Sequence, residues 1–459
     1  MRKSVEEDGS HASQPLLDEP DQVHNAKERN DLYWNFVIMC LAFSANHGCV
    51  VSCLAYATTE LGDLLGGYGS GTLYVCYALT AFLFSKPLVE MVGPKFGLFL
   101  GVFGYCVYVG GFLVAVVASS IAWPVFLGAC AVGGTAGGLL WTAQGKYFAA
   151  NSLMYASASD KPVEETNAEF AGIFAMSYLG LEMITKLLAT GVFLGLPDDA
   201  DAIIFTIYSV VAVLCAFVVS FGISDLDKYG TWDFNFNVMV FNVKSTGILL
   251  KEDVRLLLMV PFQVAFGFAS SFVPYYIFGT VIADSKQLGD TYVGLLSALI
   301  VFTGASIAIP SGWIANRYGK HVMMVTGGLC LMLTGMLLYF INDHDLGTWK
   351  LIIPYLIIYG TGRGTWENTN KAVIADLYID TPDLSTAAFA AVSFSSGVSG
   401  AFGYFVFESI ERNVIGTLIM MMSLLALICY LSVNFMEKRR KKTDMDESEE
   451  FDKFPGVER

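Results

Sequence analysis

Charged and polar side chains recur at helical spacing inside an otherwise apolar stretch of this chain. Five of them share one helical face because they lie three and four residues apart: Arg363, Trp366, Glu367, Asn370 and Lys371. A guanidinium group can hold a carboxylate through two parallel hydrogen bonds. This face would suit the binding of an organic anion or zwitterion, with Arg363 as the anchor.

A second polar stripe lies in another apolar stretch, where Tyr178, Glu182 and Lys186 follow one another at intervals of four residues. Ionisable groups inside a membrane are costly and usually face a cavity or a partner. Two interpretations remain open. Either Glu182 with Lys186, and Arg363 with Glu367, neutralise each other as structural pairs, or these groups line a central cavity and act in solute binding or gating.

Three further apolar stretches carry candidate cavity residues. Asn46 and His47 lie in the middle of the first. The histidine is either a hydrogen-bonded core residue or, because it titrates near neutral pH, a proton-coupling group. Gln263 lies close to a proline, whose kink would free backbone carbonyls for a ligand. Trp141 and Gln144 are the candidates of the third stretch.

Membrane-spanning helices must position these side chains. The chain has 459 residues, of which 54% are hydrophobic and 15% charged, and its mean hydropathy is +0.55, so a soluble globular protein is excluded. A helix needs about 20 apolar residues to cross the hydrocarbon core. Twelve such spans are predicted, at 32–57, 71–89, 97–118, 122–146, 169–195, 202–222, 256–282, 291–311, 322–341, 350–370, 386–407 and 414–435.

A sequence pattern divides these spans into two sets of six. Gly-x-x-x-Trp-x-x-x-x-Lys occurs in span 4 and again 225 residues later in span 10, at Gly137, Trp141 and Lys146 and at Gly362, Trp366 and Lys371. Repeats of this kind enclose a shared cavity in secondary transporters. We therefore expect a first bundle at 32–222 and a second at 254–435. Span 4 also carries four glycines at a spacing that favours close helix packing or a substrate contact: Gly133, Gly134, Gly137 and Gly138.

The basic residues predict the orientation. If the N-terminus is cytoplasmic, 22 of the 27 Lys and Arg residues lie on that side, as the positive-inside rule requires. We expect a disordered cytoplasmic tail at 1–31, a cytoplasmic linker at 223–253 and a cytoplasmic C-terminal tail at 436–459. The linker carries bases beside aromatic residues, which suits either a segment on the lipid headgroups or an ordinary tether: Lys228, Lys244, Lys251, Trp232, Phe234, Phe236 and Phe241.

Several functional classes find no support in the sequence. All nine cysteines lie in apolar spans without metal-ligand spacing, so packing is their expected role and no metal is expected. No set of nucleophile, base and orienting group occurs, so neither an enzyme nor a cofactor is expected. The net charge of −15 gives no indication of a nucleic-acid partner, and none is expected.

The loop after span 8 reads Gly312-Trp-Ile-Ala-Asn316-Arg317-Tyr-Gly319-Lys320. It resembles the gating loop Gly-x-x-x-Asp-Arg-x-Gly-Arg of the major facilitator superfamily. The loop after span 8 matches it with Asn for the acid and Lys for the last base: Gly312, Asn316, Arg317, Gly319 and Lys320. The loop after span 2 keeps Gly93 and has Glu90 where an acid belongs, but Met91 replaces the arginine and weakens any charge pairing. Glycines permit a short turn and close helix approach, and bases hold the loop at the anionic inner surface.

A narrower resemblance rests on spans 4, 5, 7 and 10. The stretches 141–147, 170–174 and 362–370 are similar to the signature of the "uncoordinated" ion-channel-regulator family, a branch of the same superfamily. Thr365 and the Ser270-Ser271 pair replace acids of that family, so a proton or cation role is not carried over to them. The resemblance covers roughly residues 32–435. It implies an all-α membrane protein with 12 transmembrane helices in two six-helix bundles.

Two functions of different class follow. The first is a secondary transporter that moves a small polar or amphipathic solute by alternating access, with protons or another ion as the coupling species. The alternative is a non-transporting regulator or escort of a membrane channel or receptor. Polar residues on spans 1, 4, 5, 7 and 10 favour transport, and we expect an integral multi-pass membrane protein whose partners are the lipid bilayer and the solute. A further hypothesis pairs Glu182 with Arg363 across the halves in one of the two access states.

Overall fold

The computed structural model describes residues 19–226, 232–378 and 381–452, and all regular structure within these ranges is helical. The first group of helices comprises α1 (Glu19–Leu79), η1 (Thr80–Phe84), α2 (Ser85–Val92), α3 (Pro94–Val117), α4 (Ala122–Ser159), α5 (Val163–Gly195), α6 (Ala200–Phe217) and η3 (Val218–Gly222). The second comprises α8 (Val254–Phe272), η4 (Val273–Ile282), α9 (Val293–Tyr318), α10 (Lys320–Phe340), α11 (Asp343–Leu346), α12 (Trp349–Leu377), α13 (Pro382–Val406) and α14 (Arg412–Asp452). Between the groups lies α7 (Phe236–Glu252).

Within the described residues, ten helical stretches are long and apolar enough to cross a membrane. The first of these runs for 67 residues and contains two predicted spans, because Gly62 breaks α1 with a φ of 75° that L-residues rarely adopt. The 29-residue helix α12 is not among the ten, since it carries several charged residues. With α1 counted as two spans and α12 added, the structure agrees with the twelve predicted spans.

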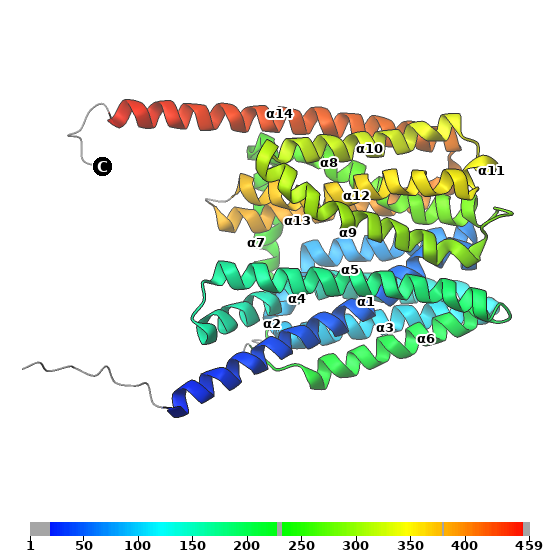
Figure 1. Ribbon diagram of the computed structural model, residues 1–459, viewed down its shortest axis with the longest axis horizontal. Helices are drawn as coiled ribbons and strands as arrows, with labels where there is room; N and C mark the ends of the chain where they lie inside the picture. Colours follow the sequence, from blue (N-terminus) through cyan, green and yellow to red (C-terminus); the bar gives the residue numbers. More distant parts are fainter. Residues whose placement is uncertain (1–18, 227–231, 379–380, 453–459) are drawn as a thin grey trace, which may run out of the picture.

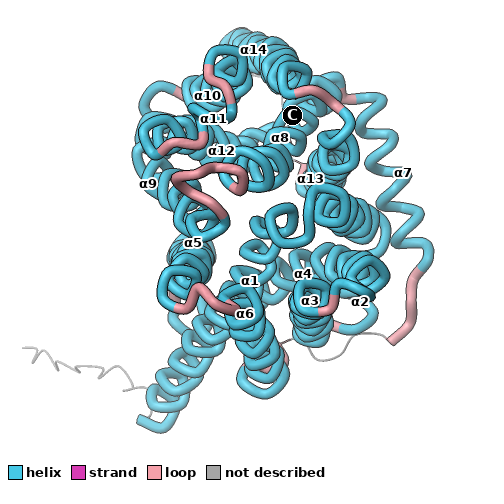
Figure 2. Tube along the Cα trace, turned by 90° about the vertical axis from the view of Figure 1, so that its right-hand side faces the viewer, coloured by secondary structure: helices cyan, strands magenta, loops and turns pink. Residues whose placement is uncertain are grey.

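The helices form two groups that lie side by side (Figure 2). In the first group α3 packs on α4 and α6, and α1 packs on α4 and α5; in the second α8 packs on α13 and α14, and α12 on α9 and α10. The groups meet where α1 contacts α13 and where α5 contacts α9. Both α1 and α14 have their free ends at one end of the molecule (Figure 1), which we call the terminal end; the opposite end is the distal end.

The glycines of span 4 serve helix packing, one of the two roles predicted for them. A Cβ atom at Gly134 would collide with the backbone of Leu73 in α1, and one at Gly138 would lie 2.7 Å from the backbone nitrogen of Ala81 in η1. On the other side of the helix, a Cβ atom at Gly133 would lie 2.7 Å from Cβ of Tyr108 in α3. These glycines therefore hold α4 close to span 2 and to span 3.

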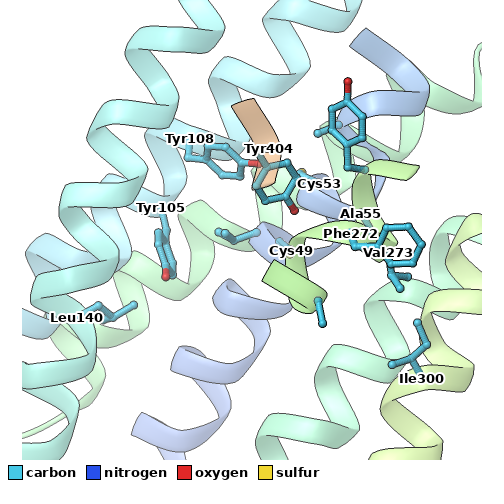
Figure 3. Close-up of a cluster of buried hydrophobic side chains, with 14 of the residues drawn as sticks. Cys49, Cys53, Ala55, Tyr105, Tyr108, Leu140, Phe272, Val273, Ile300 and Tyr404 are labelled. Atoms are coloured by element: carbon cyan, nitrogen blue, oxygen red, sulfur yellow. The ribbon is translucent and has the colours of Figure 1, made fainter. Parts of the chain in front are cut away.

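The core contains apolar side chains from both groups (Figure 3). Cys49, Cys53 and Tyr108 of the first group are buried, as are Phe272 and Tyr404 of the second. All nine cysteines are free thiols and none is exposed, so their predicted packing role is confirmed. The two groups thus share one apolar core rather than two separate ones.

Two predictions, for the N-terminal tail and for the linker, are corrected. Helix α1 begins at Glu19 rather than near residue 32, so disorder is wrong for 19–31, while 1–18 lie outside the described residues. Pro20 favours a helix start at this place because its missing N–H would have no partner in the first turn. The linker contains the helix α7 and is no simple tether. The C-terminal tail continues α14 to Asp452, because no glycine or proline interrupts this run of strong helix formers.

Candidate functional site

A cavity lies between the two groups, bounded by α5, α9 and α12. With its opening to solvent included, its empty space is about 750 Å³. Its lining is Ala175, Tyr178, Leu179, Glu182, Ile300, Val301, Gly304, Gly360, Arg363, Gly364, Glu367 and Lys371. The predicted stripe of α5 and the predicted charged face of α12 therefore meet across one cavity.

On the α5 side, Glu182 forms a tight ion pair with a residue one turn further along. Nζ of Lys186 lies 2.6 Å from Oε1 of Glu182, and the two side chains are 6% and 7% exposed. Such a pair, buried in a medium of low dielectric constant, is held by its mutual attraction. The interpretation as a structural pair thus fits Glu182 and Lys186, although Glu182 also lines the cavity.

On the α12 side, the charges are more loosely held. Nε of Arg363 lies 3.9 Å from Oε2 of Glu367, and these side chains are 37% and 40% exposed. Lys371, one turn further towards the terminal end, is exposed and lines the same cavity. A distant, half-exposed partner leaves most of the five N–H donors of a guanidinium group available. The guanidinium group of Arg363 is therefore exposed to the cavity.

His47 lies in a pocket of aromatic rings beside the cavity. Its Nε2 atom is 2.9 Å from the hydroxyl of Tyr178, which lines the cavity. The rings of Phe43, Tyr105 and Trp141 surround the imidazole at centroid distances of 6.0, 5.8 and 5.4 Å. Among the residues that the structure describes, none forms a hydrogen bond with the buried Nδ1 atom. Trp141 and His47 thus lie one layer behind Tyr178, which alone of these rings reaches the cavity.

Five other predicted cavity residues lie elsewhere. Trp366 is fully buried and donates a 2.7 Å hydrogen bond from Nε1 to the carbonyl of Met324 in α10, so its assignment to the cavity face is wrong. Gln263 and Asn370 join α8 to α12 through two reciprocal amide hydrogen bonds of 2.8 and 3.2 Å.

The remaining two are Asn46 and Gln144. Asn46 contacts the carbonyl of Ala212 in α6 at 3.4 Å and lies away from the cavity. Gln144 is buried and does not line the cavity either. Neither a position in the middle of a span nor a place in a motif tells which neighbouring helix covers a polar side chain, so the sequence could not assign these two residues correctly.

Towards the distal end, the two groups are bound to each other by polar contacts. The hydroxyl of Tyr56 accepts a 2.9 Å hydrogen bond from the backbone N–H of Gly294, and that of Thr190 accepts one of 2.7 Å from Leu295. These N–H groups belong to the first turn of α9 and lack partners within the helix. A Cβ atom at Gly294 would collide with the carbonyl oxygen of Lys186. The groups are thus closed together on the distal side of the cavity.

The two predicted gating loops form short turns at the terminal end. Gly93 and Gly319 have φ values of 82° and 94°, which glycine adopts without strain, so the predicted turns are confirmed. Close approach is wrong for Gly312, because a Cβ atom there would meet nothing within 4 Å. Asn316 is exposed, and the guanidinium of Arg317 lies over the ring of Trp313.

Both loops contact the fourth span of their own group through an ion pair. Glu90 lies 3.8 Å from Lys146 of α4, and Lys320 lies 2.5 Å from Asp376 of α12. The two ion pairs have opposite polarity. The loop of the first group supplies the acidic residue, and the loop of the second group supplies the basic residue. Although Met91 stands where the superfamily has an arginine, Glu90 still forms an ion pair, with Lys146 of α4. The spacing of residues within the loop could not predict this pair, because Lys146 lies in another helix.

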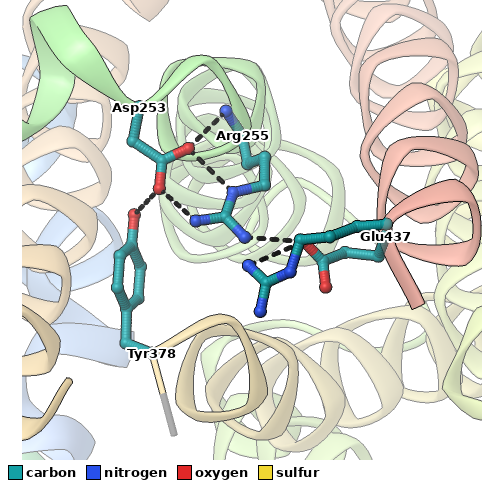
Figure 4. Close-up of polar contacts among 5 residues, drawn as sticks. Asp253, Arg255, Tyr378 and Glu437 are labelled. Atoms are coloured by element: carbon teal, nitrogen blue, oxygen red, sulfur yellow. Dashed lines mark hydrogen bonds and ion pairs between the residues drawn. The ribbon is translucent and has the colours of Figure 1, made fainter. Parts of the chain in front are cut away.

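A charged cluster at the terminal end joins three helices of the second group (Figure 4). Asp253, at the N-cap of α8, accepts hydrogen bonds from the guanidinium of Arg255 at 2.7 and 2.9 Å and from the hydroxyl of Tyr378 at 2.9 Å. Arg255 also donates to Glu437 of α14 at 2.6 Å. Burial acts to raise the pKa of Asp253, but the hydrogen bonds from Arg255 and Tyr378 outweigh it and hold that pKa below its usual value.

Three glycines that line the cavity were not among the predicted site residues. Gly304, Gly360 and Gly364 line it, and a Cβ atom at Gly364 would lie 2.6 Å from Cα of Gly304. The pair of glycines at i and i+4 in span 10 was a readable sign of close packing between helices. No group of metal-ligating side chains occurs among the described residues.

Comparisons with known proteins address the family and the fold. A family model described as ion channel regulatory protein UNC-93 matches residues 61–344, which is more than half of the chain. No curated protein sequence matches the chain.

Solved transporter structures match almost the whole chain. A peptide transporter POT in complex with sulfate has a TM-score of 0.67 at 11% identity and covers 90% of this chain and 98% of its own. The nucleoside transporter NupG has a TM-score of 0.56 at 12% identity and covers 88% and 99%. The xylose transporter XylE from E. coli has a TM-score of 0.56 at 11% identity and covers 90% and 99%.

Identities this low establish the fold alone. The predicted fold, an all-α membrane protein with the helical bundles of the major facilitator superfamily, is confirmed. Family and fold place the chain among integral multi-pass membrane proteins and not among enzymes.

Proposed function

This chain belongs to the UNC-93 family, and we propose that it is a secondary transporter that moves a small organic anion or zwitterion by alternating access. The observation that carries the proposal is the charged cavity between the two helical groups. It lies near the middle of α5 and α12 and extends towards the terminal end, while polar contacts close the distal side. A cavity open to one end is the arrangement that alternating access requires of each state.

The charges of the cavity favour an anionic group on the solute. Glu182 is neutralised by Lys186 at 2.6 Å, whereas Arg363 has its carboxylate partner at 3.9 Å, and Lys371 adds a second base. A solute carboxylate would form charge-assisted hydrogen bonds with Arg363 that Glu367 makes only weakly. Glu367 would then be free to accept a bond from an ammonium group, which is why a zwitterion fits as well.

Proton coupling through His47 is part of the proposal. His47 reaches the cavity only through the hydroxyl of Tyr178, at 2.9 Å, so a change in its charge would be felt by a solute bound there. A His47→Gln variant should lose the pH dependence of uptake while still binding solute. If uptake by the variant has the same pH profile as uptake by the unaltered chain, His47 has no role in proton coupling.

The positive-inside rule orients the proposed transporter. We place the terminal end, with both chain termini and the two gating loops, in the cytoplasm. Single cysteines at the exposed Glu165, at the start of α5, and at Thr443 in α14 should then react with an impermeant reagent from the same side of the membrane, and that side should be the cytoplasmic one.

A second candidate function is regulation of a membrane channel or receptor without transport. It is favoured by the family description, ion channel regulatory protein UNC-93. In that case the cavity would be a remnant of the fold, and surfaces outside it would bind the partner.

A binding screen separates the two candidates. Purified protein is heated with a panel of small carboxylates and zwitterions, because a ligand of the folded state raises the unfolding temperature. A hit should be lost in Arg363→Gln and retained in Lys350→Gln, a matched loss of charge on the exposed first turn of the same helix. A panel without hits, or hits retained in Arg363→Gln, would favour regulation or another site.

A further inference from the structure

The helix α7 leaves an apolar face uncovered at the terminal end of the molecule. Its buried side, with Thr246 and Leu249, packs on the protein, and the hydroxyl of Thr246 donates a 3.4 Å hydrogen bond to the carbonyl of Ala387 in α13. The opposite side carries exposed Phe236, Val240, Phe241 and Ile248 together with Lys244 and Lys251. At about 100° per residue, these six side chains fall within an arc of about 140°. We call this arc the linker face.

The linker face lies in the position of a membrane-surface helix. Helix α7 runs across the direction of the spans rather than along it (Figure 1), on the side of the bundle (Figure 2). A helix parallel to the membrane plane buries its apolar side chains at the level of the headgroups. Lysines on such a face place their carbon stems along the apolar surface and their ammonium groups among the headgroups.

The face is continuous with the lipid-facing surface of the first group. Trp232, just before α7, is 65% exposed, and its ring centroid lies 5.6 Å from that of Phe96 at the start of α3. The rings of Phe96, Phe99 and Phe103 follow one another along α3 at 5.9 and 6.1 Å. Tryptophan is enriched at the boundary between headgroups and hydrocarbon. Trp232 therefore marks the depth at which α7 lies.

From these observations we infer that the linker face is a binding surface for the anionic headgroups of the surrounding bilayer. The charges on the face are Lys244 and Lys251, with Glu252 at one edge. Basic side chains beside an apolar helix face attract anionic lipid. A protein partner would instead be expected to meet a face with fewer lysines at its centre, since lysine is depleted in protein interfaces.

The surface has a consequence for both helical groups. Helix α7 contacts α13 and α8 of the second group, and it also contacts α2 and η1 of the first. A headgroup bound to α7 therefore acts on a segment that touches both groups at the terminal end. This inference concerns the linker and does not depend on the proposed transport.

Depth measurement in a bilayer tests the location. The full chain carrying a nitroxide at Phe241→Cys is reconstituted into phosphatidylcholine with phosphatidylglycerol, with the unaltered chain as the background for its native cysteines. Phe103→Cys on α3 is the lipid-exposed control and Thr443→Cys on α14 the water-exposed control. The label at 241 should collide with oxygen, as the label at 103 does, and should be shielded from a water-soluble nickel complex relative to the label at 443. Two results would overturn the inference. In the first, the label at 241 collides with the water-soluble nickel complex as often as the label at 443 does. In the second, a protein surface shields the label at 241 from both oxygen and the nickel complex.

Lipid selectivity tests the charges. In the double variant Lys244→Gln with Lys251→Gln, the ratio of bound phosphatidylglycerol to bound phosphatidylcholine should fall by about fivefold for each lysine removed. Mass spectrometry of the intact protein with its bound lipids measures this ratio. Lys286→Gln with Lys350→Gln, two exposed lysines of the distal end, should lose none, and Lys244→Arg with Lys251→Arg should retain the selectivity. Unchanged selectivity in the glutamine variant, in protein whose unfolding temperature is unchanged, would overturn the inference.

Discussion

Lys186 Nζ lies 2.6 Å from Glu182 Oε1 on one turn of α5, and both side chains are buried. The second ion pair of the site differs in both respects: Arg363 is 3.9 Å from Glu367, and both side chains are partly exposed. The structure thus distinguishes two ion pairs whose residues have the same spacing of four in the sequence. One pair is held by the protein, and the other is available to a solute.

Loss of Lys186 should destabilise the protein strongly. In Lys186→Met the carboxylate of Glu182 would be buried without its partner, which costs about 3–5 kcal/mol. The unfolding temperature of the purified variant should fall accordingly. The double variant Glu182→Gln with Lys186→Met removes both charges and should regain most of that loss. A double variant as unstable as the single one would show that the pair is not the source of the effect.

Exchange of charges tests whether Glu182 also pairs with Arg363 in the second access state. Glu182→Arg with Arg363→Glu should recover part of the uptake that each single reversal loses. The control is Glu182→Lys with Lys186→Glu, which preserves the pair seen in this structure. Recovery in the control alone would leave Glu182 a structural partner of Lys186 in both states.

Arg363→Ala should abolish solute binding with little loss of folded protein, because the nearest carboxylate among the described residues, that of Glu367, is 3.9 Å away and half-exposed. If Arg363 merely neutralises Glu367, Arg363→Ala combined with Glu367→Ala should restore binding. Thermal unfolding with and without solute measures both quantities. Restored binding in the double variant would show that these two residues have a structural role and do not bind the solute.

Gly294→Ala should weaken the closure at the distal end. The added Cβ would collide with the carbonyl oxygen of Lys186, across the boundary between the groups. Gly312→Ala on the same helix meets nothing within 4 Å and serves as the matched control. Distances between spin labels on the distal ends of α5 and α9 should lengthen in Gly294→Ala alone. Equal distances in the two variants would show that this contact does not determine the closed state.

The cluster at Asp253 should give the protein an acid-sensitive contribution to stability. Its pKa is lowered in the folded state, so the contribution is complete above the usual carboxyl pKa, near 3.9, and is lost as pH falls below it towards the folded value. Asp253→Asn should cost about 1–3 kcal/mol at neutral pH. The difference in unfolding temperature between variant and unaltered chain should shrink as pH falls below 4. A difference that is constant from pH 7 to pH 3 would contradict this.

The sequence predicted the fold best where local chemistry decides it. The turns at Gly93 and Gly319 follow from glycine at a positive φ, and the spans follow from the length of the apolar runs. The end of α14 does not follow from the charge composition of 436–459, because charged residues suit a solvated tail and a solvated helix equally well. The break at Gly62 depends on one glycine among several in the same segment, and composition cannot single it out.

The site could be predicted only in part. Arg363, Glu367 and Lys371 were placed together because a spacing of four residues survives in any straight helix. Trp366 and Asn370 were added to that face wrongly as cavity residues, since Met324 of α10 and Gln263 of α8 cover them. The partners across the boundary, such as Tyr56 with Gly294, are separated by 238 residues and leave no periodic sign.

The central claim is that the cavity opens alternately to the two sides of the membrane. Leu179→Cys places a thiol in the cavity wall on α5, and Thr443→Cys on α14 serves as a one-sided control. Vesicles of either orientation are treated with an impermeant thiol reagent, and the labelling is compared with that of the unaltered chain. If the cavity opens alternately, position 179 should be labelled from both sides of the membrane and position 443 from one side. Labelling of position 179 from the side of 443 alone would contradict transport.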